Sequence, residues 1–121
     1  IADYVSFPGF TANLPEKIRD ASIYVLSSDY EGISNSLAEA MAVGLPVIST
    51  DCPIGGSKMC IRDGQNGLLV PVGDAQRLAS AMERLAGDPP YAAGIGREAE
   101  QIRERYSLES IGYLWMKCLK G

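Results

Sequence analysis

The sequence contains no histidine, and its three cysteines do not form a Cys-x-x-Cys pair. Without histidine, Ser–His–Asp and Cys–His catalysis are excluded, and the commonest protein ligand for metal ions is missing. The cysteines, at positions 52, 60 and 118, are odd in number and widely spaced. This usage argues against a disulfide framework and a structural zinc site, and it favours a reducing cytoplasm.

Long apolar runs and clusters of positive charge are also missing. The longest apolar runs are only a few residues long, so no segment is expected to span a bilayer, and no signal peptide is recognisable. The net charge is −4, with 11 Lys and Arg against 15 Asp and Glu. Because binding to a phosphate backbone needs clustered Lys and Arg, no nucleic-acid partner is expected. A small anionic ligand remains compatible, since a helix N-terminus binds phosphate without net positive charge.

Short β-like runs alternate with helical patterns along the 121 residues, which is typical of an α/β domain with a mainly parallel sheet. The predicted strands cover residues 4–7, 23–26, 47–49 and 68–70, and the second of them is expected to be buried on both faces. Helices are predicted from Asn13 to about Ala21 and from Asn35 to Val43, with a helical turn at 57–61. Three apolar stripes predict further helices: Leu78, Met82 and Leu85; Ile95, Ala99, Ile102 and Tyr106; Leu108, Ile111, Trp115 and Leu119.

The segment from Tyr30 to Thr50 is the most informative part of the chain. It predicts a loop, a helix and a strand after a buried strand, and ligands of open α/β sheets bind at the carboxyl ends of strands. From Leu37 to Val43 every residue except Glu39 is apolar, so this helix should be buried nearly all round. A buried carboxylate is costly unless it is bound by a partner, which favours a ligand-binding role for Glu39. The alternatives are a narrow solvated stripe or a salt bridge to an arginine.

The start of the same helix is rich in polar residues. Ser34, Asn35 and Ser36 are strong cap formers, and the first N–H groups of a helix lack partners, which suits an anion such as a diphosphate. Plain capping is the alternative. Glu31, next to the flexible Gly32, is suited to accept hydrogen bonds from sugar hydroxyls beside such an anion. Its alternative is an ordinary solvated glutamate.

Two glutamates separated by seven residues resemble the E-x7-E motif of retaining glycosyltransferases with the GT-B fold. The chain is similar to glycosyltransferase family 4 from about Asp3 to Leu85, through "FPGF", "DASIYVLSSDYEGISNSLAEAMAVGLPVISTD" and "DGQNGLLVPVGD". The resemblance implies a Rossmann-like three-layer parallel sheet. It also implies that residues 1–121 form a single C-terminal nucleotide-sugar-binding domain that lacks its first strands and the N-terminal acceptor domain.

The resemblance assigns roles to individual positions. Glu39 would bind the ribose hydroxyls of the donor, and Glu31, the catalytic carboxylate, would contact the transferred sugar. The other implied contacts are Gly32 and Ile33 along the sugar, Ser34, Asn35, Ser36 and Leu37 at the diphosphate, and Phe10 and Thr11 near the nucleobase. No cofactor and no metal are required in the family, and the chain has no DxD motif. The family's Arg and Lys for the diphosphate lie upstream, and Lys17, Arg19 and Lys58 do not match their positions.

These features predict an enzyme of polysaccharide or lipopolysaccharide biosynthesis. It would transfer a sugar from a nucleotide-diphosphate sugar, with a UDP-sugar favoured, to a glycan or lipid-linked acceptor with retention. The chain alone would be inactive, and its exposed edge strand would favour self-association. We expect a cytoplasmic protein, peripheral at the inner membrane through the missing domain. A regulatory donor-binding module without catalysis and a GT-B epimerase or phosphorylase remain as alternatives.

Overall fold

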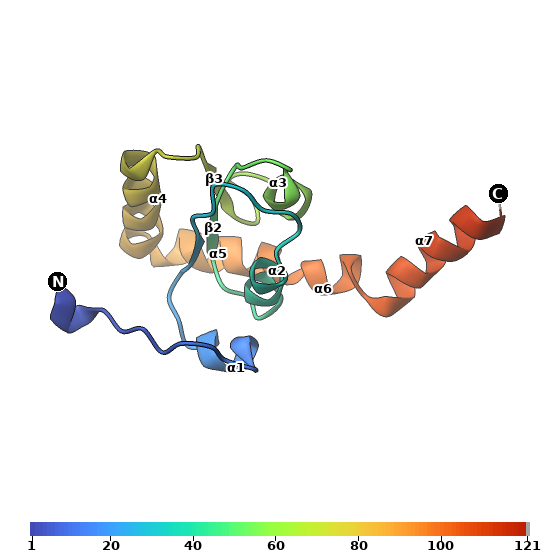
Figure 1. Ribbon diagram of the computed structural model, residues 1–121, viewed down its shortest axis with the longest axis horizontal. Helices are drawn as coiled ribbons and strands as arrows, with labels where there is room; N and C mark the ends of the chain where they lie inside the picture. Colours follow the sequence, from blue (N-terminus) through green and yellow to red (C-terminus); the bar gives the residue numbers. More distant parts are fainter. Residues whose placement is uncertain (121) are drawn as a thin grey trace.

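The computed structural model describes residues 1–120, which form a small parallel sheet with helices on both faces (Figure 1). The strands are β1 (Tyr24–Leu26), β2 (Val47–Thr50) and β3 (Leu68–Val70). A short 3-10 helix, η1 (Ala2–Tyr4), comes first in the chain. The helices are α1 (Leu14–Ile18), α2 (Asn35–Ala42), α3 (Gly56–Cys60), α4 (Ala75–Gly87), α5 (Pro89–Glu100), α6 (Ile102–Arg105) and α7 (Leu108–Lys120).

The sheet has the order β1-β2-β3, and both pairings are parallel. Successive strand residues face opposite layers, so Val47 and Ile48 of β2 belong to different core clusters. Val47 packs with α2, α3 and α6, whereas Ile48 packs with α4. Helix α5 contributes to both clusters and runs across the end of the sheet (Figure 1). The arrangement confirms the predicted three-layer α/β fold.

The predicted strand at residues 4–7 is wrong. Tyr4 ends η1, and the chain then continues without regular structure to α1, with Tyr4 94% and Phe7 92% exposed. A strand is stable only beside a neighbour. A doubly wound sheet has its six strands side by side in the order 3-2-1-4-5-6. In that arrangement β1, β2 and β3 are the fourth, fifth and sixth strands, and residues 4–7 would be the third strand, at the far edge of the sheet. Within residues 1–120, no strand fills the two places between them.

The same open side of the sheet corrects the burial expected for residues 23–26. All three residues of β1 are only half-buried, because β1 is an edge strand of the described sheet. The fully buried strand is β2, which has a neighbour on each side. The predicted self-association through this edge stays a prediction.

The ends of the first two α-helices follow local capping signals. Asn13 caps α1: its Oδ1 accepts from the Glu16 N–H at 3.4 Å, and its Nδ2 donates to the Glu16 carboxylate at 2.7 Å. This capping pair was predicted, although α1 ends at Ile18 rather than near Ala21. Helix α2 has its predicted start at Asn35, and Gly44 adopts the predicted left-handed conformation after it, with φ +80°.

The apolar stripes near the C-terminus are buried to different degrees. Leu85 of α4 is buried, but Met82 of the same predicted stripe is 43% exposed. The second stripe is interrupted at Gln101, which separates α5 from α6. Helix α7 projects away from the sheet (Figure 1), and its residues Leu108 and Trp115 are 94% and 65% exposed. The periodicity therefore predicted an amphipathic helix correctly, but residues 1–120 do not cover its apolar face.

No helix within residues 1–120 combines the length and the apolar character that crossing a membrane requires.

Candidate functional site

The first turn of α2 is anchored to β1 by a chain of hydroxyl groups. Tyr24 donates from its hydroxyl to Ser36 Oγ at 2.7 Å, and Ser36 Oγ lies 2.9 Å from Ser34 Oγ. Ser34 is 8% exposed and forms the N-cap, since its Oγ accepts from the Leu37 N–H at 3.4 Å. Ser34 therefore serves as the cap and Ser36 links it to β1, and Tyr24 is a residue of this site that was not predicted from the sequence. Its signal was a phenol within an otherwise apolar strand.

The cap determines which N–H groups at this helix end stay free. The Leu37 N–H, predicted to face a diphosphate, is bonded to Ser34 Oγ, although 3.4 Å is a long and weak contact. Within residues 1–120, the N–H groups of Asn35 and Ser36 have no hydrogen-bond acceptor. Free N–H groups together with the positive end of the helix dipole favour an anion at this position.

The loop that carries Glu31 is bonded to the loop that follows β2. The Glu31 N–H donates to the Pro53 carbonyl at 2.9 Å, and the Ile54 N–H donates to the Glu31 carbonyl at 3.2 Å. Ser28 Oγ donates to the Glu31 carboxylate at 3.4 Å, while Thr50 Oγ1 donates to the Ser28 carbonyl. These bonds fix the backbone of Glu31 at the carboxyl ends of β1 and β2 and leave its carboxylate partly exposed.

Gly56 packs directly on the backbone of this loop. A Cβ atom added to Gly56 would lie 1.8 Å from the Gly32 carbonyl oxygen and 2.6 Å from the Ile33 nitrogen. Gly55 precedes it with φ +91°, a conformation that favours glycine. The pair of glycines therefore brings the start of α3 against Gly32 and Ile33, which are themselves exposed.

Glu39 lies on the partly exposed side of α2. It is four residues after Asn35, so the two side chains share one side of the helix, about 6 Å apart along its axis. Leu37, Ala40 and Met41, on the other side, are each 0% exposed. Within residues 1–120 the Glu39 carboxylate has no ion pair and no hydrogen bond, so the alternative of a salt bridge is not formed there. The expectation that this helix is buried nearly all round is wrong, because α2 is buried on one side only and Glu39 lies on its partly exposed side.

Phe10 and Thr11 lie in the irregular segment before α1. Phe10 is 96% exposed and Thr11 is partly exposed, and no hydrogen bond or core contact within residues 1–120 joins either of them to the start of α2. The structure therefore gathers Glu31, Gly32, Ile33 and residues 34–37 at one edge of the sheet, but not these two. Their nucleobase contact stays a prediction.

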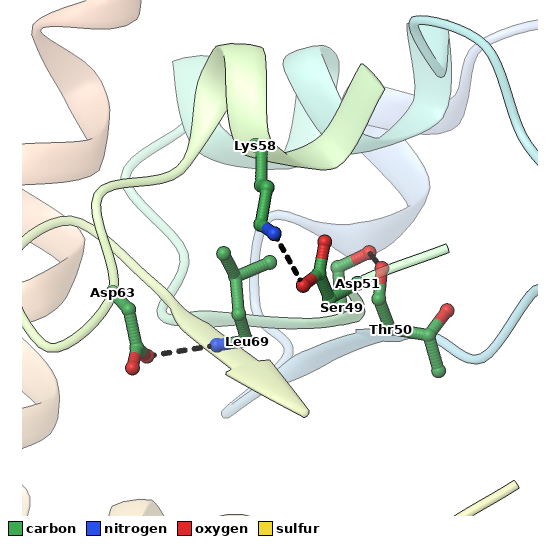
Figure 2. Close-up of polar contacts among 6 residues, drawn as sticks. All are labelled: Ser49, Thr50, Asp51, Lys58, Asp63 and Leu69. Atoms are coloured by element: carbon green, nitrogen blue, oxygen red, sulfur yellow. Dashed lines mark hydrogen bonds and ion pairs between the residues drawn. The ribbon is translucent and has the colours of Figure 1, made fainter. Parts of the chain in front are cut away.

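A cation that the sequence analysis set aside lies at the same edge. Lys58 reaches from α3 to Asp51 just beyond the end of β2, with 2.7 Å between Nζ and the carboxylate (Figure 2). Asp51 is held by its own N–H, which donates to the Val70 carbonyl at 2.8 Å. The buried hydroxyls of Ser49 and Ser57 lie 2.7 Å apart and join α3 to β2.

Within the described residues, no three His, Cys, Asp or Glu side chains are grouped so that they could hold a metal ion. Independence from metal stays a prediction.

These features together define an α/β protein with a candidate site at one edge of its sheet: a helix N-terminus and two adjoining loops at the carboxyl ends of parallel strands. The family model "Glycosyl transferases group 1" matches residues 1–88. The chain belongs to this family of glycosyltransferases.

Relatives and solved structures agree with this assignment. The lipopolysaccharide core biosynthesis glycosyltransferase LpsE of Rhizobium meliloti is 30% identical over 120 residues, which cover 98% of this chain and 35% of LpsE. Anabaena HepE in complex with UDP superposes with a TM-score of 0.91 at 26% identity, over 98% of this chain and 33% of HepE. The C-terminal domain of a group 1 glycosyltransferase, LpcC of Francisella tularensis, superposes with a TM-score of 0.71 at 29% identity, over 81% of this chain and 51% of that structure. The chain thus spans about a third of LpsE and of HepE, and it has the fold of a GT-B glycosyltransferase.

Proposed function

We propose that this chain is the donor-binding part of a longer retaining glycosyltransferase of family 4. The enzyme transfers a sugar from a nucleotide-diphosphate sugar, preferably a UDP-sugar, to a glycan or lipid-linked acceptor. The chain is a single domain, and a separate N-terminal domain supplies the acceptor site. Without that domain the chain does not catalyse transfer. The enzyme works in the cytoplasm, at the membrane surface where lipid-linked acceptors are found.

One observation carries this proposal: the start of α2 lies at the carboxyl edge of the sheet, between the Glu31 loop and the exposed side of Glu39. The free N–H groups of Asn35 and Ser36 suit the diphosphate, because they need no further rearrangement to bind an anion. The similarity to UDP-bound HepE, at a TM-score of 0.91, supports UDP as the nucleotide. The lipopolysaccharide role in the name of LpsE supports a glycan or lipid-linked acceptor.

The chemistry required of this site is modest. The donor's bond to the diphosphate breaks, and negative charge develops on the departing phosphate oxygen. N–H groups aimed at that oxygen stabilise the charge, and a fixed sugar orientation lowers the entropic cost of attack. Glu31 orients the sugar through its hydroxyls, and Glu39 binds the ribose hydroxyls. None of these steps needs a metal ion.

The ribose role of Glu39 is tested by titrating the full-length protein with UDP and with 2′,3′-dideoxy-UDP. A hydrogen bond to a charged group contributes about 1.5–3 kcal/mol, so Glu39→Gln should weaken UDP binding by roughly 10- to 100-fold. The affinity for the dideoxy nucleotide should stay the same, because its ribose lacks the hydroxyls. Glu83→Gln is the matched control, since Glu83 is exposed on α4, on the other face of the sheet. Unchanged UDP affinity in Glu39→Gln would defeat the assignment.

The sugar role of Glu31 predicts a different pattern. Glu31→Gln should bind free UDP as the wild type does and should lose most of its turnover of the UDP-sugar. Equal loss of nucleotide affinity and turnover would contradict this division of roles. The anomeric configuration of the product, measured by proton NMR coupling constants, tests retention, and an inverted product would exclude it.

A further inference from the structure

The hydroxyl group of Tyr24 joins β1 to the first turn of α2. Tyr24 and Leu26 face the layer that contains α2, whereas Val25 faces the other layer. The ring of Tyr24 packs against the core of that layer, and its hydroxyl donates to Ser36 Oγ at 2.7 Å. A phenylalanine would supply the same packing without this bond, so what the phenol adds is a hydrogen bond to the start of α2.

The hydroxyl groups of Tyr24, Ser36 and Ser34 carry more hydrogens than the bonds between them use. Two hydrogen bonds join the three oxygens, at 2.7 and 2.9 Å, and each bond uses one of the three hydroxyl hydrogens. Ser34 Oγ also accepts from the Leu37 N–H, which uses no hydroxyl hydrogen. Whichever serine donates to the other, one serine O–H is therefore left without an acceptor within residues 1–120.

The bond from Tyr24 fixes the side chain of Ser36 and strengthens the unused donor. Because the phenol donates to Ser36 Oγ, the serine side chain is held in one rotamer. A hydroxyl that accepts a hydrogen bond also becomes a stronger donor. The unused O–H belongs to the same helical turn as the free N–H groups of Asn35 and Ser36. The first turn of α2 thus combines an O–H donor with N–H donors at the positive end of the helix dipole.

We propose that Tyr24 is a positioning residue for the diphosphate of the nucleotide donor: through its bond to Ser36, it fixes the serine O–H that donates to a phosphate oxygen. The inference rests on the proposed function, and it assigns a residue outside the E-x7-E motif and outside the positions that the family resemblance supplied. Without the phenol hydroxyl, Ser36 is free to change its rotamer, and binding of the diphosphate has to overcome the entropy of fixing it. The ribose and the base of the donor do not depend on this hydroxyl.

The test compares the affinities of UDP and uridine in the full-length protein and its variants. Tyr24→Phe should weaken UDP binding by about threefold to tenfold, the size expected for one hydrogen bond between uncharged groups, and should leave uridine binding unchanged. Tyr91→Phe is the matched control, because it also removes a phenol hydroxyl from a ring beside the core. Tyr91 lies in α5, and its hydroxyl has no hydrogen-bond partner within residues 1–120. This control should bind UDP and uridine as the wild type does.

A double variant and the uridine measurement separate positioning from a purely structural role. If Tyr24 acts through Ser36, Tyr24→Phe should have no further effect on UDP affinity in a Ser36→Ala background, because the hydroxyl that the phenol fixes is already gone. Additive losses in the double variant would overturn the inference, since Tyr24 would then act without Ser36. If the bond only holds α2 against the sheet, Tyr24→Phe should weaken UDP and uridine alike, because Glu39 would move with the helix, and the inference is again overturned.

The inference and the proposed function can fail separately. Wild-type UDP affinity in Tyr24→Phe would overturn the role of Tyr24 while leaving the proposed function intact. A wild type that binds no UDP would refute both.

Discussion

Replacing Gly56 by alanine should damage the candidate site without touching any side chain predicted to bind the donor. The added Cβ would lie 1.8 Å from the Gly32 carbonyl oxygen and 2.2 Å from the Gly32 carbonyl carbon, whereas real Cβ contacts stay at 3.0 Å or more. The two backbones would therefore have to separate by about 1 Å. Because both partners are backbone atoms, no side-chain rotation can relieve the clash.

The cost can be worked out from the contacts that this separation strains. Overpacking of a tightly packed position costs about 1–3 kcal/mol. The two hydrogen bonds between Glu31 and the Pro53–Ile54 backbone join the same two loops, and each is worth about 1 kcal/mol. If both bonds are lost, we therefore expect Gly56→Ala to lower the free energy of unfolding by about 3–5 kcal/mol. A displacement of this size at a positioning loop can also reduce kcat/KM by about 100-fold.

Two assays on the full-length protein check this prediction: urea unfolding followed by circular dichroism, and donor turnover under conditions where the variant is still folded. Gly87→Ala is the matched control, because an added Cβ there meets no atom within 4 Å and Gly87 ends α4 on the opposite face of the sheet. If Gly56→Ala matched this control in both stability and kcat/KM, the close approach of α3 to Gly32 would be refuted.

Two further predictions concern stability. In α5, Gly94→Ala should stabilise the fold by about 0.5–1 kcal/mol through helix propensity. Gly96→Ala should instead destabilise the fold, because its Cβ would lie 2.2 Å from the Gly44 carbonyl oxygen. If urea unfolding showed that both substitutions stabilise the fold, the close packing of Gly96 on Gly44 would be contradicted. Burial, and next the electrostatic interaction with the nearby Cys60 side chain, raise the pKa of Tyr106 above its usual value of 10.0. Between pH 10 and the raised pKa, the folded state therefore keeps the phenol protonated while the unfolded chain loses the proton. The contribution of Tyr106 to the free energy of unfolding is complete below pH 10 and is lost as pH rises through the raised pKa. Stability measured against pH should fall less steeply above pH 10 in Tyr106→Phe, and identical slopes would exclude the effect.

Elements with strong local end signals could be predicted from the sequence. Helix α2 was predicted with the correct first residue, because Ser34 before it accepts a hydrogen bond from the first turn and Gly44 supplies the left-handed ending. Strand β3 was predicted with its observed bounds because a tight turn precedes it, where Gly64 adopts φ +74°. These signals act over a few residues, so a local pattern is sufficient to find them.

Residues 4–7 and α7 show where a local pattern fails. The first has the composition of a strand, but a strand is stabilised by hydrogen bonds to a neighbour that residues 1–120 do not provide. The second has the periodicity of a packed helix, yet Leu119 at its end is 75% exposed. Periodicity identifies an apolar face and does not identify what covers it.

The sequence predicted that residues 31–37 lie together but not the contacts that hold them, and the difference has a physical origin. Glu31, Glu39 and the start of α2 occur within nine consecutive residues, so their spacing is visible in the sequence. The bonds that fix them join distant segments: Tyr24 to Ser36, and Glu31 to the backbone of Pro53. The Glu31–Pro53 bond depends on the pairing of β1 with β2, which brings the ends of both strands to the same edge, whereas the Tyr24–Ser36 bond depends on the packing of α2 beside β1. The geometry of the candidate site therefore depends on strand pairing and helix packing together. If the proposed function is right, substitutions that weaken the pairing of β1 with β2 should impair nucleotide binding even when Glu31 and Glu39 are intact.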